Sequence, residues 1–175
     1  MKINWKIIPK HTIDVGKLTD PYEICDLLKQ HKIRKYVYRI NYKGIVLKYG
    51  MSADKSRNYG DRLYRQIAHS ESWGARRNNG SSGSDWRIIE DDFHKLYGSK
   101  IDKAEMKIKI WNLTNYPFVS IDPTKEVFYV EQNLIETYAK VVGEKPIGNI
   151  NDDANYKRKG YIPKNLFGND GLFED

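Results

Sequence analysis

The chain has 175 residues, and its 30 Lys and Arg against 23 Asp and Glu give a net charge of +7. This length predicts one domain with a substantial core, and the positive charge favours a polyanionic partner such as nucleic acid over a neutral metabolite. The single cysteine, Cys25, excludes an internal disulfide and a thiolate zinc cluster and predicts a cytoplasmic setting. No apolar run is long enough for a membrane span, and the first ten residues are too interrupted by charge for a signal peptide.

The first predicted helix covers residues 20–30. Asp20 is placed as an N-cap, Pro21 follows at the first helical position, and Glu23 is placed to return a hydrogen bond to the cap. We expect this helix to belong to the scaffold.

A β-hairpin is predicted next, from the β-rich runs at residues 36–40 and 45–50. The segment between them ends in Gly44, which can supply the left-handed position of a turn. With a three-residue turn at residues 42–44, position 41 faces position 45. That register places Tyr38 directly opposite Lys48 on the same face of the ribbon, so that a phenol and an ammonium become neighbours.

Beyond the hairpin, residues 60–69 have helical periodicity and residues 71–84 have the Gly, Ser, Asn and Arg content of a surface loop. Residues 85–96 predict a helix, residues 105–111 a strand and residues 117–121 a further strand. A long helix is expected to begin at Asp122 and Pro123 and to end at Gly143.

Glu131 lies inside the apolar stripe of this long helix. Val127, Leu134 and Tyr138 occupy the minus four, plus three and plus seven positions around it, so the four side chains share one face. An ionised carboxylate there requires compensation, which a cation, an arginine or a partly open cleft would each provide. In the alternative interpretation, Glu131 lies at the rim of the stripe and points to water.

Five short motifs, taken together, resemble the GIY-YIG nuclease superfamily, and the last two resemble the end of the nuclease domain in the excision-repair UvrC proteins. They are Tyr36-Val37-Tyr38, Lys48-Tyr49-Gly50-Met51-Ser52, Arg62-Leu63, Glu131-x-Asn133-Leu134-Ile135 and Pro146-x-x-Asn149.

Three positions depart from the family pattern. Tyr36 replaces the glycine of the first motif, and Lys48 replaces the second tyrosine, as in some small restriction enzymes of the superfamily. Gln66 stands where the family often has His or Tyr, four residues after Arg62. Arg65 and His69 keep the Arg-x-x-x-His spacing instead, so the choice between Arg62 and Arg65 stays open.

The resemblance implies an α/β (α+β) fold with a three-stranded antiparallel sheet flanked by helices. It covers residues 35–151, with an insertion at about residues 71–103. Residues 1–34 would then be an N-terminal helical extension and residues 152–175 a basic tail.

The resemblance also implies catalytic roles. Tyr38 would act as general base, because an adjacent Lys48 ammonium favours the phenolate. Glu131 would be the sole protein ligand of one Mg²⁺ or Mn²⁺ ion. In the structural alternative, Tyr36, Tyr38 and Ile40 are simply the core face of a strand. The remaining candidates are Arg62 for phosphate charge, Asn149 for orienting Glu131 or a metal-bound water, and His69 as a phosphate contact or proton relay.

The expected function is a sequence-specific double-stranded DNA endonuclease of the type II restriction class, acting as a homodimer and leaving 5′-phosphate and 3′-hydroxyl ends. The alternatives are a repair or mobile-element nicking nuclease, or a catalytically silent nucleic-acid-binding module. The side chains expected to contact DNA, with those of the Arg- and Asn-rich loop suited to read bases, are Arg65, Arg76, Arg77, Asn78 and Asn79.

Overall fold

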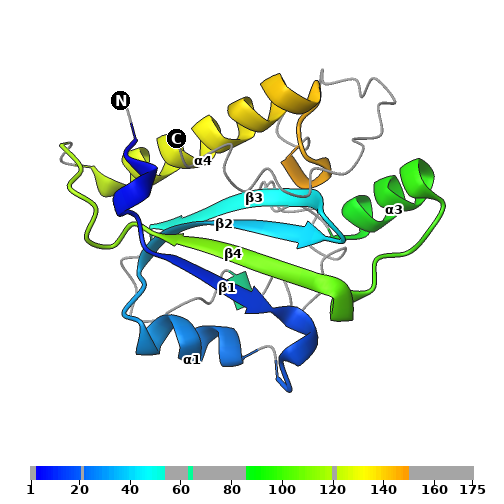
Figure 1. Cartoon of the computed structure of the whole chain (residues 1–175), viewed down its shortest axis with the longest axis horizontal. Coiled ribbons are helices and arrows are strands. Elements are labelled where there is room, and N and C mark those ends of the chain that lie inside the picture. The colour runs from blue at the N-terminus through cyan, green and yellow to red at the C-terminus, as the bar shows by residue number, and fades with distance from the viewer. Residues whose placement is uncertain (1–2, 21, 54–62, 65–85, 120–121, 150–175) are drawn as a thin grey trace, which may run out of the picture.

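The computed structural model describes residues 3–20, 22–53, 63–64, 86–119 and 122–149. These residues form one antiparallel sheet with helices around it, in the order β1-β4-β2-β3 (Figure 1). The mixed α/β class is confirmed, but the described sheet has four strands rather than the expected three. Its strands are β1 (Lys10–Asp14), β2 (Lys35–Tyr42), β3 (Ile45–Ala53) and β4 (Met106–Asn112).

The fourth strand, β1, comes from the segment that was expected to be a helical extension. It pairs with β4 along its whole length, with Ile13 opposite Ile108. Ile13 is the only buried residue of β1, because an edge strand needs only one apolar contact to the core. The N-terminal segment is therefore part of the same sheet as the hairpin.

Helix α1 (Glu23–Gln30) begins three residues after Asp20, and the two hydrogen bonds of the predicted cap are present in the turn before it. The Asp20 carboxylate accepts a hydrogen bond from the Tyr22 amide at 2.8 Å, and the Glu23 carboxylate accepts one from the Asp20 amide at 3.0 Å. Glu23 also accepts hydrogen bonds from the hydroxyl and the amide of Thr19. The Thr19 hydroxyl contributes most to lowering the pKa of Glu23, followed by the Asp20 amide.

The hairpin formed by β2 and β3 is present, but its predicted register is wrong. The turn has two residues, Lys43 and Gly44, both at positive φ, and the pairing shifts by one residue at Ile40 and Asn41. Tyr38 consequently lies opposite Gly50, and Lys48 lies opposite Ile40. Because opposite and alternate residues share a face, Tyr38 and Lys48 remain on the same face, as diagonal neighbours.

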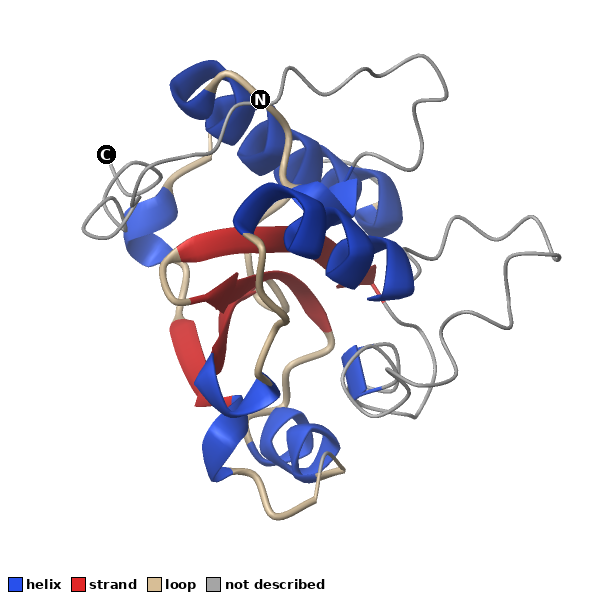
Figure 2. Ribbon diagram, turned by 90° about the vertical axis from the view of Figure 1, so that its right-hand side faces the viewer, coloured by secondary structure: helices blue, strands red, loops and turns tan. Residues whose placement is uncertain are grey.

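The two faces of the sheet pack against different helices (Figures 1 and 2). We call the face with Tyr36, Tyr38 and Ile40 the inner face, and it packs against α1, Leu63 and α3 (Trp86–Tyr97). The outer face packs against α4 (Pro123–Val142). Helix α3 lies in the expected insertion, yet its Ile89 and Phe93 belong to the inner-face core.

The segments around α4 agree only in part with the sequence prediction. Gly143 ends the helix as expected, with φ of 90° and its amide bonded to the Ala139 carbonyl at 2.8 Å. The described residues 117–119 form no strand, since the Phe118 amide turns back to the Tyr116 carbonyl. Within the described ranges, no helix combines the length and apolarity needed to cross a bilayer. The remaining elements are short 3-10 helices: η1 (Trp5–Ile7), η2 (Val15–Lys17), η4 (Lys103–Glu105) and η5 (Ile147–Asn149).

Candidate active site

Tyr38 of the first hairpin motif lies directly against Gly50 of the second. A Cβ atom added to Gly50 would lie 2.2 Å from both the ring carbon Cζ and the hydroxyl oxygen of Tyr38. The hydroxyl end of the phenol therefore occupies the space that a side chain at position 50 would need. The glycine of the second motif is thus explained by the tyrosine of the first.

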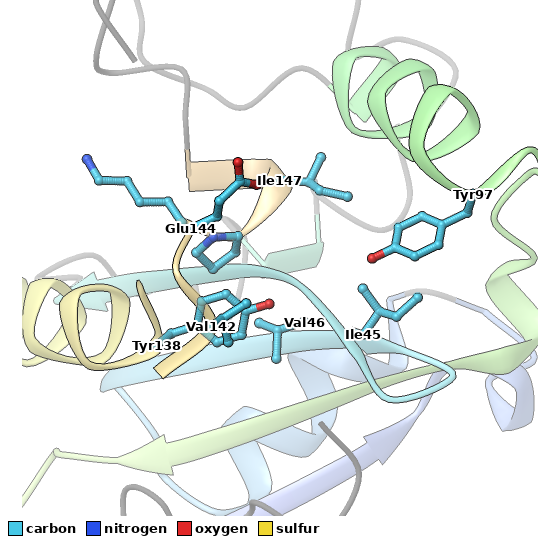
Figure 3. A pocket seen from close by; sticks show the side chains of 9 residues that line it. Ile45, Val46, Tyr97, Tyr138, Val142, Glu144 and Ile147 are labelled. Carbon is cyan, nitrogen blue, oxygen red and sulfur yellow. The ribbon is translucent and has the colours of Figure 1, made fainter. Parts of the chain in front are cut away.

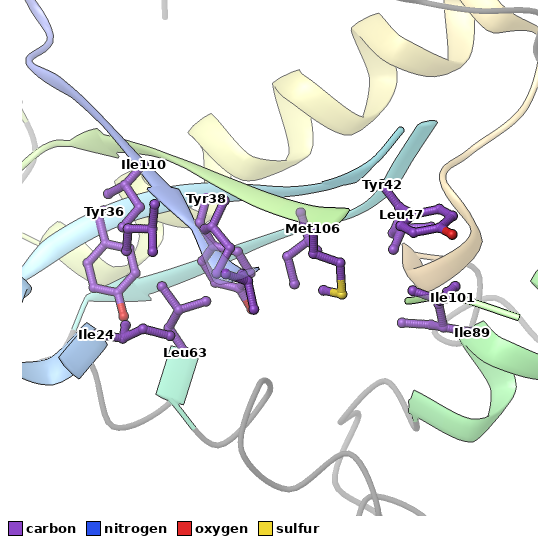
Figure 4. Close-up of a cluster of buried hydrophobic side chains, with 14 of the residues drawn as sticks. Ile24, Tyr36, Tyr38, Tyr42, Leu47, Leu63, Ile89, Ile101, Met106 and Ile110 are labelled. Atoms are coloured by element: carbon purple, nitrogen blue, oxygen red, sulfur yellow. The ribbon is translucent and has the colours of Figure 1, made fainter. Parts of the chain in front are cut away.

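Tyr38 is also a core residue, with 1% of its surface exposed. It packs in the inner-face cluster with Tyr36, Ile40, Leu63 and Ile110 (Figure 4). The structural alternative is therefore confirmed for the packing, because Tyr36, Tyr38 and Ile40 are all buried on the core face of β2. The hydroxyl end of this buried ring lies beside Gly50.

Lys48 lies on the same face, next to the segment that follows α4. Its exposed fraction is 8%, and a Cβ atom added to Gly148 would lie 2.9 Å from its own Cβ. The same added atom would lie 3.0 Å from Cδ1 of Ile89 and 3.0 Å from the Leu47 carbonyl oxygen. Helix η5 and α3 thus approach β3 closely at the position of the second motif, and Gly148 makes that approach possible.

Asn149 makes two hydrogen bonds to the main chain of Tyr49. Its Nδ2 donates to the Tyr49 carbonyl at 2.9 Å, and the Tyr49 amide donates to its Oδ1 at 2.8 Å. β3 is an edge strand, so one side of its backbone lacks a neighbouring strand, and the Asn149 amide takes that strand's place. We expected Asn149 to orient Glu131 or a metal-bound water, whereas the structure shows it holding the backbone between Lys48 and Gly50.

Glu131 lies beside the buried stripe of α4, and the sequence analysis left open whether it is inside that stripe or at its rim. Val127, Leu134 and Tyr138 are buried around it, and Glu131 itself is half-buried. Helix α4 packs on the outer face, where the rings of Tyr138 and Tyr49 are 6.1 Å apart. Tyr38 belongs to the inner face, so the phenol and the carboxylate come from elements on opposite faces of the sheet.

A metal site with several protein ligands is absent from the described part of the chain. No three His, Cys, Asp or Glu side chains gather there into a metal-binding group. Glu131 is the carboxylate that the sequence analysis singled out as a metal ligand. A hard ion such as Mg²⁺ or Mn²⁺ accepts one protein carboxylate and keeps several water ligands, whereas Zn²⁺ sites use three or four protein ligands.

Several predicted site residues lie outside the described residues. Leu63 and Tyr64 are the described part of the predicted helix at residues 60–69, and Leu63 is fully buried in the cluster that contains Tyr38. The Tyr64 ring lies 5.5 Å from the ring of Tyr22 on the residue preceding α1. The predicted site residues that lie outside the described residues are Arg62, Arg65, His69, Arg76, Arg77, Asn78 and Asn79.

Two histidines to which the sequence assigned no role are in ring contact. His11 of β1 and His31, directly after α1, have ring centroids 4.6 Å apart. Burial lowers the pKa of His11, and the nearby charge of His31 lowers it further. Protonation of His11 is therefore disfavoured in the folded protein.

A second group that the sequence analysis missed is a pair of cations over a tryptophan. The Arg39 guanidinium lies 5.7 Å from the ring centre of Trp111, and Nζ of Lys109 lies 5.5 Å from it. The alternation of residues 107, 109 and 111 along β4 was the signal that these side chains share a face.

The described chain also contains a small cavity between β3, α3 and the end of α4 (Figure 3). The cavity volume, taken as the space open to the centre of a water molecule, is about 10 Å³, which is room for about one water molecule. The buried carboxylate of Glu144 and the Tyr97 and Tyr138 rings border it, together with apolar side chains. Its size excludes a nucleotide-sized ligand.

Compared with known proteins, the chain matches no family model, no curated protein and no solved structure. A functional proposal therefore has to come from the residues themselves.

Proposed function

We propose that this protein is a metal-dependent DNA endonuclease of the GIY-YIG type, most similar to the small type II restriction enzymes. The observation that carries the proposal is the packing of the Tyr38 hydroxyl against Gly50, with Lys48 on the same face. Asn149, 100 residues away in sequence, holds Tyr49 between them. Tyr38, Gly50 and Asn149 are positions at which the chain resembles the superfamily, and Lys48 is similar to some of its small restriction enzymes.

In this proposal Tyr38 takes the proton from the attacking water, and the Lys48 ammonium favours the resulting phenolate. Arg62 or Arg65 neutralises charge on the non-bridging phosphate oxygens. Glu131 holds one Mg²⁺ or Mn²⁺ ion, which when bound stabilises charge on the departing 3′ oxygen. The products carry 5′-phosphate and 3′-hydroxyl ends.

In this proposal the scissile phosphate lies at the β3 edge of the sheet, beside the hydrogen bonds of Asn149 to Tyr49. Tyr38 and Lys48 are on the inner face, Glu131 is on a helix of the outer face, and β3 is the edge strand nearest to α4. A substrate bound at this edge is the arrangement in which both faces contribute to one site. Cutting both strands of a symmetric sequence would require two copies of the chain, so we propose a cytoplasmic homodimer.

A catalytically silent nucleic-acid-binding module is the second candidate. The observation that favours it is the 1% exposure of Tyr38, since a general base must contact the water that it activates. In that case the hairpin motifs only pack the core, and the positive charge of the chain binds nucleic acid.

One assay separates these functions. Plasmid DNA is incubated with Mg²⁺ and the parent protein, Glu131→Ala, or Glu136→Ala, which removes an exposed carboxylate from the same helix. The restriction enzyme predicts discrete fragments that Glu131→Ala abolishes and Glu136→Ala preserves. Nicks or a smear instead identify a repair or mobile-element type of nuclease. DNA binding without any cleavage identifies the silent module and overturns the proposal.

A further inference from the structure

One half of the outer face lies beyond α4, and at the Trp111 end of this half Trp5 of η1 packs against Trp111, with ring centroids 6.2 Å apart. Helix α4 packs mainly on β3 and reaches β2, whereas the outer-face side chains of β1 and β4 lie beyond it. The register of β1, β4 and β2 places three rows of side chains across this half. We call these outer-face residues the basic half-sheet: Lys10, Thr12, Arg39, Asn41, Lys107 and Lys109.

Two cations of the basic half-sheet are held in place by a tryptophan. Trp111 is fully buried, and the side chains of Arg39 and Lys109 lie over its ring. A cation within about 6 Å of an aromatic ring centre is attracted to the face of that ring. Arg39 is 6% exposed, so it lies beneath the surface, while Lys109 is half-buried.

The charge of this surface is strongly one-sided. Among the outer-face positions of β1, β2 and β4, Asp14 is the single acidic residue in these described strands. The Lys17 ammonium lies 3.8 Å from the Asp14 carboxylate and offsets its charge. Lys10 and Lys107 are exposed to solvent on either side of Lys109. The exposed side chains here are Lys and Thr, so an apolar partner surface would find nothing to bury.

We propose that the basic half-sheet binds the sugar-phosphate backbone of DNA. Lysines on neighbouring strands give a group of point charges about 5 Å apart across the sheet and about 7 Å apart along it. Such an array suits phosphates and carries no base-reading chemistry, so the contact is independent of DNA sequence. The choice of DNA as the polyanion rests on the proposed function. Because the surface lies on the face opposite to Tyr38, it holds duplex away from the cleaved bond.

The test is the salt dependence of DNA binding, measured by fluorescence anisotropy on a duplex without divalent metal so that no cleavage occurs. The variant is Lys10→Ala/Lys107→Ala/Lys109→Ala. A matched control, which removes the same charge from exposed lysines on other surfaces, is Lys29→Ala/Lys100→Ala/Lys140→Ala. Arginine at the three half-sheet positions should restore binding, because it keeps the charge. Thermal melting verifies that all the variants are folded.

Each phosphate contact contributes about 0.9 to the slope of log affinity against log salt. The half-sheet variant is therefore expected to lower that slope by about 2 to 3, with the control variant close to the parent. Equal slopes and affinities for the two variants overturn the inference, as does a parent protein that binds no duplex. These outcomes are independent of cleavage. If the half-sheet variant has a lowered slope but the parent never cuts DNA, the binding surface is supported and the nuclease is refuted. If the parent cuts DNA but the two variants have equal slopes, the nuclease is supported and the binding surface is refuted.

Discussion

Gly50→Ala is the substitution that most sharply probes the contact between the two hairpin motifs. The new Cβ atom would lie 2.2 Å from the hydroxyl oxygen and from Cζ of Tyr38, whereas an ordinary contact begins at 3.4 Å. The tyrosine ring or the strand must therefore move by about 1.2 Å in a core with no spare space, and such overpacking costs about 1–3 kcal/mol.

The effect of Gly50→Ala on the free energy of unfolding should change sign when the Tyr38 ring is removed. In Tyr38→Val, the atoms that collide with the added methyl group are gone, and valine remains a good strand residue. Glycine within a strand is less stable than alanine by roughly 0.5–1 kcal/mol, so Gly50→Ala is then expected to be neutral or stabilising. The two backgrounds should differ by about 2 kcal/mol or more, which is a coupling energy typical of residues in direct contact.

Urea unfolding of the parent, both single variants and the double variant measures this coupling. Tyr38→Val alone is expected to lose up to about 3 kcal/mol through the cavity it leaves. If Gly50→Ala costs the same in both backgrounds, the contact between Tyr38 and Gly50 does not exist, and the structural basis of the proposed site is refuted.

Three further predictions concern the edges of the fold. Asn149→Ala removes both hydrogen bonds to Tyr49 and should lower the free energy of unfolding in urea by about 1–3 kcal/mol. The Tyr49 amide should also exchange its hydrogen faster, and an unchanged exchange rate would contradict this prediction. The pKa of His11 is lowered by burial and by His31, so the unfolded chain binds this proton more readily, and the free energy of unfolding should fall as pH drops through about 6.5. His11→Gln should flatten that fall between pH 8 and pH 5.5, and an unaltered pH profile would count against the shift. Gly143→Ala places a side chain at φ of 90° and should cost about 1 kcal/mol by the same unfolding assay, where a neutral result would refute the strain.

The elements with strong local signals could be predicted from the sequence. The cap at Asp20 and Glu23 and the helix end at Gly143 depend on hydrogen bonds within a few residues, and both are confirmed. The apolar stripe around Glu131 also follows from helical spacing alone. In each case the determining contacts lie within one element or directly beside it.

The predictions that were wrong concern features that depend on partners distant in sequence or on a one-residue difference in turn length. The hairpin register was wrong because a two-residue turn and a shift at Ile40 and Asn41 cannot be distinguished from a three-residue turn by composition. Strand β1 was missed because an edge strand needs only Ile13 in the core. The hydrogen bonds of Asn149 to Tyr49 required knowing that β3 is a free edge, which is a property of the whole sheet.

Single-turnover cleavage by Tyr38→Phe tests the central claim most directly. Phenylalanine keeps the ring that packs in the core and removes only the hydroxyl beside Gly50. The proposed base predicts that, with Mg²⁺, the cleavage rate falls by about 10²–10⁴-fold while DNA affinity stays unchanged. Cleavage by Tyr38→Phe at the parent rate would contradict the account.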